Sequence, residues 1–353
     1  MQNKVLLIIT FFLFFVTTAF TQNSYTLDNN PGAPSNYKTL QGALDSVPGG
    51  SIILIQGSSH SYGVGNVTKP VAIYGPGYFL GQNAAPNTQA ILMQAKLSSL
   101  SFSAGSQGSI LSGVSFEYST GDDLLTRINF VSTNNISISR CKLQILGSTQ
   151  GFYGNNANNI NISQCFIDAD GQLVVGPGFN FTFKNNIIQC TTIGIVGNAQ
   201  NFTCMFLNNS FRGNIGELSF ANCTFINNVI MCLNPAATRY IDVPMTYASH
   251  NVSNVDIFPA GGVNITNADE PNTYTLFSDP AISSSDGIYQ LKSGSVAIGY
   301  GNDGTDAGAY GTTNMRYVFS GIPAIPNIYF ANPQQVGTTT GGLKIQLKIK
   351  ANN

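Results

Sequence analysis

The feature that most restricts the fold of this chain is an internal repeat of roughly 22 residues in its central part. Its clearest copies are 136–143, 160–167, 181–188, 204–211 and 223–230. A fainter copy precedes them at 109–116. Because one such unit cannot bury its apolar side alone, successive copies have to stack on one another. The repeat therefore predicts a solenoid.

Aligned positions of the repeat are chemically alike. The third position holds Ile138, Ile162, Phe183, Phe206 and Phe225, and the sixth holds Cys141, Cys165, Asn186, Asn209 and Asn228. Alternation of apolar and polar residues predicts a strand whose first and third positions point inward. The change of pattern between the third and sixth positions indicates a corner, where asparagine is favoured because it tolerates a left-handed backbone. Stacked at a strand spacing of ~4.8 Å, such a column can form a ladder of amide hydrogen bonds.

The flanking segments indicate how the solenoid begins and ends. In 36–47, the apolar residues Leu40, Ala43, Leu44 and Val47 have helical spacing, which predicts a helix that covers the first coil. Segment 343–350 alternates apolar with mainly basic residues and predicts a strand along the side or end of the solenoid. An attachment or secretion tag is the alternative for this segment.

These patterns predict an all-β fold, namely a single-stranded right-handed parallel β-helix with an N-terminal capping helix and a short C-terminal β tail. The handedness follows from the general rule for parallel crossover connections. The expected boundaries are 1–21 for a signal peptide, 22–316 for the β-helix, and 317–353 for a Pro/Gly linker and the C-terminal strand.

The first 21 residues have the pattern of a secretory signal. Lys4 precedes an apolar run at 5–16, and small residues come before Gln22. The run is too short for a membrane helix, and no later segment reaches the ~20 apolar residues that a span requires. No cysteine lies near the cleavage point, so we expect a secreted or cell-surface protein without a lipid anchor.

Charge is sparse along the whole chain. Only 9% of its residues are charged, against about 25% in typical soluble domains. The formal net charge of −1 gives no electrostatic basis for binding nucleic acid or an anionic membrane. Oligomeric state cannot be inferred from the sequence.

Several segments resemble a known group of proteins. Segments 37–41, 52–57 and 70–75 resemble the opening coils of secreted right-handed β-helix repeat proteins of the pectate-lyase-like superfamily. Segments 287–292, 295–299 and 304–311 resemble the closing coil of these proteins. The resemblance covers roughly residues 36 to 320 and implies the fold. The superfamily includes lyases, hydrolases, binding proteins and adhesins, so function has to be argued from a site.

The six cysteines fall into the repeat columns. Cys141 and Cys165 share a corner position on neighbouring coils, and Cys204 and Cys223 share an inward position. Cys190 and Cys232 lie two coils apart. In this pattern cysteine behaves as a small apolar side chain. Oxidation of a neighbouring pair stays open, because stacked Cα atoms lie within the range that a disulfide permits.

The position that follows each repeat copy forms an outward column. It holds Gln144, Asp168, Gln189, Arg212 and Met231. Asp168 and Arg212 are then two coils and roughly 10 Å apart, with Gln189 between them. We predict that Gln144, Asp168, Gln189 and Arg212 bind substrate. Arg140, Lys142 and Lys184 are expected on nearby coils, and Phe152, Tyr153 and Phe166 are candidate stacking partners for a sugar.

Two enzyme classes, a glycosidase and a uronate lyase, are weighed against the residues that the chain offers. A glycosidase needs a pair of carboxylates about the scissile bond, and the one acidic doublet of the repeat region, Asp122 and Asp123, is typical of a solvated turn. A uronate lyase is the better enzyme hypothesis. It needs Ca²⁺, for which Asp168 and Asp170 are candidate ligands, and a base, for which Arg212 is the candidate.

The favoured hypothesis is a secreted or surface β-helix protein that binds polysaccharide or a cell-surface glycan, or that serves as a structural or adhesive module. The alternative is a Ca²⁺-assisted lyase that acts on uronate-containing glycans, and Ca²⁺ is the one cofactor considered. An adhesin that self-associates through the strand at 344–350 is a third hypothesis.

Overall fold

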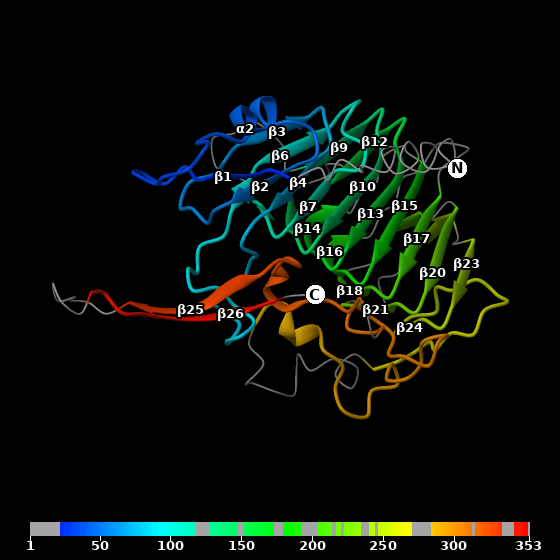
Figure 1. Cartoon of the computed structure of the whole chain (residues 1–353). Helices are drawn as coiled ribbons and strands as arrows, with labels where there is room; N and C mark the ends of the chain where they lie inside the picture. The colour runs from blue at the N-terminus through cyan, green and yellow to red at the C-terminus, as the bar shows by residue number, and fades with distance from the viewer. Residues whose placement is uncertain are drawn as a thin grey trace, which may run out of the picture.

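The computed structural model describes residues 22–117, 127–146, 151–172, 179–192, 203–213, 217–219, 222–233, 240–243, 246–269, 284–312, 315–333 and 342–351. Within these ranges the chain forms a parallel β-solenoid whose coils stack their strands into long sheets (Figure 1). The predicted signal segment, the doublet Asp122 and Asp123, and residues 334–341 of the predicted linker lie outside the described residues. No helix of the described part has the length and apolarity that crossing a membrane requires.

Three parallel sheets form the walls of the solenoid. The ten-stranded sheet consists of β1 (Ser24–Leu27), β2 (Ser51–Ile55), β4 (Val71–Tyr74), β7 (Ile110–Ser112), β10 (Asn134–Ser139), β13 (Asn158–Ser163), β15 (Phe179–Lys184), β17 (Cys204–Leu207), β20 (Cys223–Ile226) and β23 (Tyr247–Ser249). The eight-stranded sheet consists of β5 (Lys96–Leu97), β8 (Ser115–Phe116), β11 (Lys142–Leu146), β14 (Phe166–Gln172), β16 (Ile187–Thr192), β18 (Ser210–Gly213), β21 (Val229–Cys232) and β24 (Val252–Ser253). The four-stranded sheet consists of β3 (Val64–Val67), β6 (Ser99–Phe102), β9 (Arg127–Val131) and β12 (Phe152–Asn155), and β19 (Glu217–Ser219) pairs separately with β22 (Tyr240–Val243).

The predicted inward columns form the core. All five residues at the third repeat position are buried, and the register of the ten-stranded sheet places them side by side. The rings of Phe183 and Phe206 stack with their centroids 4.9 Å apart, and those of Phe206 and Phe225 are 4.6 Å apart. The prediction of this column is confirmed, because apolar side chains that recur once per coil bury each other.

The predicted corner is also present. Six consecutive coils have a non-glycine residue with positive φ between the ten-stranded and eight-stranded sheets: Arg140, Gln164, Asn185, Asn208, Asn227 and His250. The next residue in the later coils points inward and forms the predicted amide ladder. Asn186 Nδ2 donates to Asn209 Oδ1 at 2.9 Å, and Asn209 Nδ2 donates to Asn228 Oδ1 at 3.0 Å. These amides are fully buried, so the ladder satisfies groups that water cannot reach.

A short helix, α2 (Leu40–Ser46), lies beside β3 (Figure 1). The Oγ1 of Thr39 caps it by accepting a hydrogen bond from the backbone N–H of Gly42 at 3.2 Å. It is shorter than the predicted segment 36–47, because Val47 precedes a proline and takes an extended conformation. The missing side chain of Gly65 allows the close approach, since a Cβ atom there would lie 2.8 Å from Leu40.

After the last coil the chain returns along the outside of the solenoid (orange in Figure 1). We call residues 284–312 and 315–327 the strap. Corner side chains bind the strap's backbone, and the order of the strap residues is the reverse of the order of the corners. The backbone N–H of Asn302 donates to Asn227 Oδ1, and Asn185 donates to the carbonyls of Ala309 and Gly311. Gln164 donates to the carbonyl of Arg316, and Arg140 donates to the carbonyl of Ile322. The resemblance implies a closing coil over much of this segment. The described part instead has the 3-10 helices η3 (Gly287–Tyr289) and η4 (Phe319–Gly321) joined by turns.

The chain ends in an antiparallel hairpin of β25 (Asn327–Pro333) and β26 (Ile345–Lys350), which projects from the solenoid (Figure 1). Asn327 Nδ2 donates to the carbonyl of Thr88 at 3.1 Å, and the N–H of Ala90 donates to the carbonyl of Ile328 at 2.8 Å. The predicted C-terminal strand thus pairs with the segment that follows the strap. The predicted boundary after residue 316 falls within the strap.

All six cysteines are free and buried. Cys204 and Cys223 are register neighbours in β17 and β20, as their repeat position predicts. Burial raises the pKa of the Cys165, Cys190 and Cys204 thiols, which keeps these side chains neutral. They pack in the interior as small apolar side chains do.

Candidate functional site

The outer face of the eight-stranded sheet brings four predicted residues into one row. Strand register places Gln144 beside Asp168, Asp168 beside Gln189, and Gln189 beside Arg212. Each residue comes from a successive coil, β11, β14, β16 and β18, and each is partly exposed. Neighbouring members are separated by the strand spacing of about 4.8 Å. We call Gln144, Asp168, Gln189 and Arg212 the polar row.

Glu117 extends the polar row by one coil. It directly follows β8, and the register of β8 with β11 continues to the level of Gln144. Sequence reasoning missed this residue because the outward column was counted only in the five clear repeat copies. The fainter copy at 109–116 gives Glu117 at the same position, so the signal was present.

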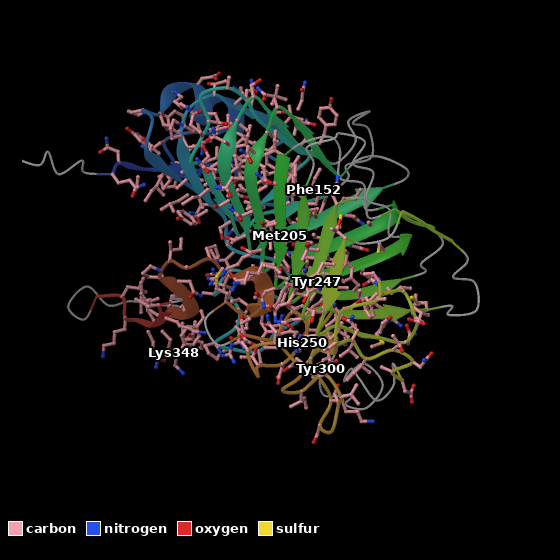
Figure 2. All side chains as sticks on the ribbon, turned by 90° about the vertical axis from the view of Figure 1, so that its right-hand side faces the viewer. Phe152, Met205, Tyr247, His250, Tyr300 and Lys348 are labelled. Carbon is pink, nitrogen blue, oxygen red and sulfur yellow. The ribbon has the colours of Figure 1, made fainter. Side chains whose placement is uncertain are left out.

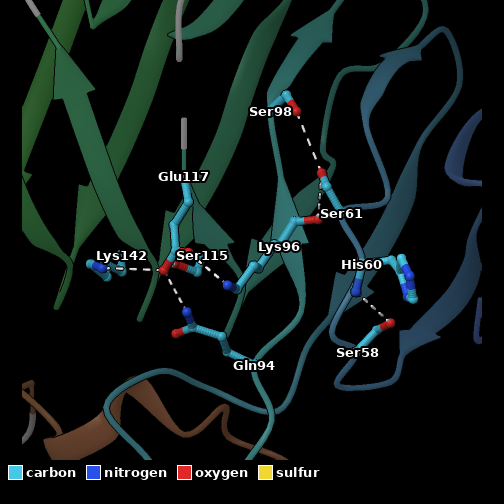
Figure 3. A network of polar contacts seen from close by, with 9 residues as sticks. All are labelled: Ser58, His60, Ser61, Gln94, Lys96, Ser98, Ser115, Glu117 and Lys142. Carbon is cyan, nitrogen blue, oxygen red and sulfur yellow. Dashed lines mark hydrogen bonds and ion pairs between the residues drawn. The ribbon is translucent and has the colours of Figure 1, made fainter. Parts of the chain in front are cut away.

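Glu117 is held by donors from β5, β8, β11 and the segment that precedes β5 (Figure 3). Its Oε2 lies 3.1 Å from Lys96 Nζ, and its Oε1 lies 3.2 Å from Lys142 Nζ. Oε1 also accepts hydrogen bonds from Ser115 Oγ at 3.0 Å and from Gln94 Nε2. Burial alone would raise the pKa of Glu117, but the two ammonium groups outweigh it and lower that pKa. Glu117 is therefore a fixed carboxylate at neutral pH.

The strap covers the outward positions next to the polar row. Phe166, Ile187 and Val229 are buried beneath it. The ring of Tyr289 packs against that of Phe166 with centroids 6.4 Å apart, and its hydroxyl donates to Gln189 Oε1 at 3.1 Å. The polar row is therefore partly exposed, with the strap along one side.

Two of the three aromatic residues proposed to stack on a sugar are inaccessible. Phe166 is buried under the strap, and Phe152 lies in the interior of the solenoid. Tyr153 remains partly exposed. The sequence could not separate these cases, because the strap is not part of the repeat.

The three basic residues expected on nearby coils have different surroundings. Lys142 lies on the eight-stranded sheet and binds Glu117. Lys184 ends β15 in the ten-stranded sheet, away from the polar row. Arg140 is a buried corner residue that donates to Gln164 Oε1 at 3.0 Å and to the carbonyl of Ile322 at 2.9 Å. Burial lowers the pKa of Arg140, whose guanidinium fastens the strap rather than facing a substrate.

The donor set for Ca²⁺ can be compared with what the ion requires, which is six to eight oxygen ligands. Asp168 supplies one carboxylate, and its register neighbours Gln144 and Gln189 supply amide oxygens. The backbone of Asp170 lies in β14, but its side chain lies outside the described residues. Among described side chains no group of three or more His, Cys, Asp or Glu could hold a metal ion. The described donors do not fit Ca²⁺, so we derive no catalytic step through it.

No protein-family model matches the chain, and no curated protein sequence matches it significantly.

Proposed function

We propose that the chain is a secreted, right-handed β-helix protein of the pectate-lyase-like kind that binds polysaccharide along the polar row without cleaving it. In this proposal residues 1–21 are a signal peptide, α2 caps the first coil, and the segment after 316 is a C-terminal tail. A mature N-terminus at Gln22, determined by sequencing of the exported protein, would support the first of these points. An uncleaved N-terminus would oppose it.

The observation that carries the proposal is the in-register row of hydrogen-bonding side chains, one on each coil from β11 to β18. A polysaccharide offers hydroxyl groups at regular intervals along an extended chain. A row that repeats donors and acceptors at about 4.8 Å can meet several successive sugar units. Isolated polar residues on a globular surface lack this periodic match.

The chemistry of the row also favours an acidic or mixed glycan. Gln144 and Gln189 carry both amide donors and acceptors, and Arg212 can donate in parallel to a carboxylate of a uronate unit. The carboxylates Glu117 and Asp168 do not dominate the charge here, because the cations Lys96, Lys142 and Arg212 outnumber them. The low overall charge makes specific hydrogen bonds the larger contribution to binding.

The proposal is tested by retention of the folded protein on a panel of acidic and neutral polysaccharides in affinity electrophoresis. We expect retardation by at least one acidic polymer and a smaller retardation for Gln144→Ala. The matched control is Thr182→Ala, which removes a polar side chain from the outer face of the ten-stranded sheet in β15. No retardation across the panel would reject the proposal.

A uronate lyase is the second candidate, favoured by one observation: Asp168 and Arg212 lie in the same row with only Gln189 between them. In that hypothesis Arg212 would take the proton next to the uronate carboxylate while the bond to the leaving sugar oxygen breaks, and water would supply the proton that this oxygen takes up. Release of new reducing ends from a retained polymer, with Ca²⁺ present and lost in Arg212→Ala, would establish this activity. Retention without release supports binding alone.

A further inference from the structure

The C-terminal hairpin has an aliphatic face that the solenoid does not cover. Ile345, Leu347 and Ile349 in β26 are 56%, 47% and 63% exposed. Leu343, just before the strand, is 57% exposed, and Ile328 in β25 is 40% exposed. Exposed aliphatic groups of this number on one small element indicate an interaction surface, because large contiguous apolar patches on monomers are often functional.

The register of the hairpin puts these side chains on one face. Ile349 lies opposite Ile328, Leu347 opposite Ala331, and Ile345 opposite Pro333. Directly opposed residues of an antiparallel pair share a face, so the six form a continuous aliphatic surface. We call it the aliphatic face.

The opposite face of the hairpin is basic. Lys348 lies opposite Phe330, with its Nζ 5.2 Å from the ring centroid. Lys344, Gln346 and Lys350 alternate with the aliphatic residues and therefore share this side. Figure 2 shows Lys348 on the hairpin, apart from Met205 and Tyr247 on the ten-stranded sheet. No acidic residue follows Asp306 in the sequence.

The aliphatic face continues into a pocket where the hairpin meets the solenoid. The pocket has a volume of about 480 Å³, and Ile328 and Ala331 form part of its hairpin wall. Leu54, Tyr74 and Met93 line it from the solenoid side. A partner that covers the aliphatic face can therefore also contact apolar groups of the solenoid.

We propose that the aliphatic face is a homodimer interface, in which the hairpins of two copies stack face to face about a two-fold axis. Such an isologous contact buries the same aliphatic residues from both copies and leaves the lysines on the two outer surfaces. Stacked sheets lie about 10 Å apart, which allows the opposed side chains to interdigitate.

Pairing through the free edge of β26 is less favourable. In an antiparallel pair, Lys344, Lys348 and Lys350 of both copies would come together on one face, and like charges there are destabilising. Lysines on an edge strand are a common protection against such pairing. Face-to-face stacking avoids this repulsion.

A lipid surface also fits less well than a second copy. A flat ribbon that placed its aliphatic face in a membrane would turn its lysines away from the headgroups, since strand side chains alternate between opposite faces.

The contact area sets the strength of the dimer. Stable interfaces bury about 800 Å² on each partner and involve about 20–30 residues a side, whereas the aliphatic face consists of six residues. We therefore expect dissociation in the micromolar range.

Sedimentation velocity of the purified mature chain across a concentration series tests this proposal. We expect a monomer–dimer equilibrium that persists at high salt, because apolar contacts hold the dimer. Leu347→Glu should weaken association at least tenfold, because it would bury a charge without a partner. Gln346→Glu is the matched control, since it adds the same charge one residue away on the opposite face and should leave the dimer intact.

Ile349→Glu provides a second variant, and near-native thermal melting of each variant shows that the solenoid is folded. Wild-type protein that stays monomeric up to about 100 µM would overturn the proposal. Full dimerisation of both Leu347→Glu and Ile349→Glu would overturn it as well. Monomeric protein that sediments with phosphatidylcholine–phosphatidylglycerol vesicles, in a manner that Leu347→Glu abolishes, would also overturn it in favour of a lipid partner.

Discussion

At the scale of single residues, consecutive Asn–Asn pairs determine how the later coils turn. The first residue of each pair, such as Asn185, adopts the left-handed backbone and donates its amide outward to the strap. The second, such as Asn186, points inward and joins the buried ladder. In the two preceding coils a cysteine takes the inward position, and the ladder ends where the N–H of Cys165 donates to Asn186 Oδ1 at 2.9 Å. One dipeptide thus supports both the corner and the core.

The ladder predicts a large loss of stability for Asn209→Leu. Asn209 accepts from the backbone N–H and the amide of Asn186, and it donates to the carbonyl of Phe183 and to Asn228 Oδ1. Leucine would leave several of these groups buried without a partner, which costs about 4 kcal/mol in total. Urea unfolding measures the change. The control Asn161→Leu, on the outer face of the ten-stranded sheet, should change stability by about 0.5 kcal/mol or less, and equal losses would contradict the ladder's role.

Glu117 predicts a defined dependence of stability on pH. Because its pKa is lowered in the folded chain, its contribution is fully present above the ordinary value of 4.5 and is lost as the pH falls through the folded pKa. The free energy of unfolding of wild type should exceed that of Glu117→Gln at pH 7. This difference should shrink as the pH is lowered below about 4.5. A difference that stays constant through the acidic range would show that the ion pairs do not stabilise the fold.

At the scale of elements, the repeat and the strap differ in how far the sequence predicts them. Strand columns are predictable because each coil repeats the same inward and outward positions, and this includes the order of Gln144, Asp168, Gln189 and Arg212. The strap has no period. Its small residues Ala297, Ala307 and Ala309 pack on outward apolar residues of the eight-stranded sheet, and only the folded solenoid brings these together. The burial of Phe166 and the engagement of Gln189 by Tyr289 therefore could not be foreseen.

Among the corner side chains, we expect Arg140 to contribute most to the stability of the strap's packing against the solenoid. Arg140→Ala removes charge-assisted hydrogen bonds to Gln164 and to the carbonyl of Ile322, and it should cost about 3 kcal/mol. Limited proteolysis should then cut the strap faster than in wild type. Arg316→Ala, which removes an exposed guanidinium in the strap itself, serves as the control. If both variants were cut at the same rate, Arg140 would not be the fastening residue.

At the scale of the whole molecule, two surfaces are presented on different elements. The polar row follows the solenoid across coils of the eight-stranded sheet, and the aliphatic face lies on the protruding hairpin. A dimer through the hairpins would carry two polar rows. Both rows could bind the same polymer, which would raise the apparent affinity without any new contact.

Glycan binding along the polar row is tested by isothermal titration of a retained polysaccharide into wild type, Arg212→Ala and Thr182→Ala. Arg212→Ala should weaken binding about tenfold or more, which corresponds to the loss of a charge-assisted hydrogen bond. Thr182→Ala, on the ten-stranded sheet, should bind as wild type does. Unchanged affinity for Arg212→Ala together with weakened affinity for Thr182→Ala would contradict binding along the polar row and place the glycan site on the ten-stranded sheet.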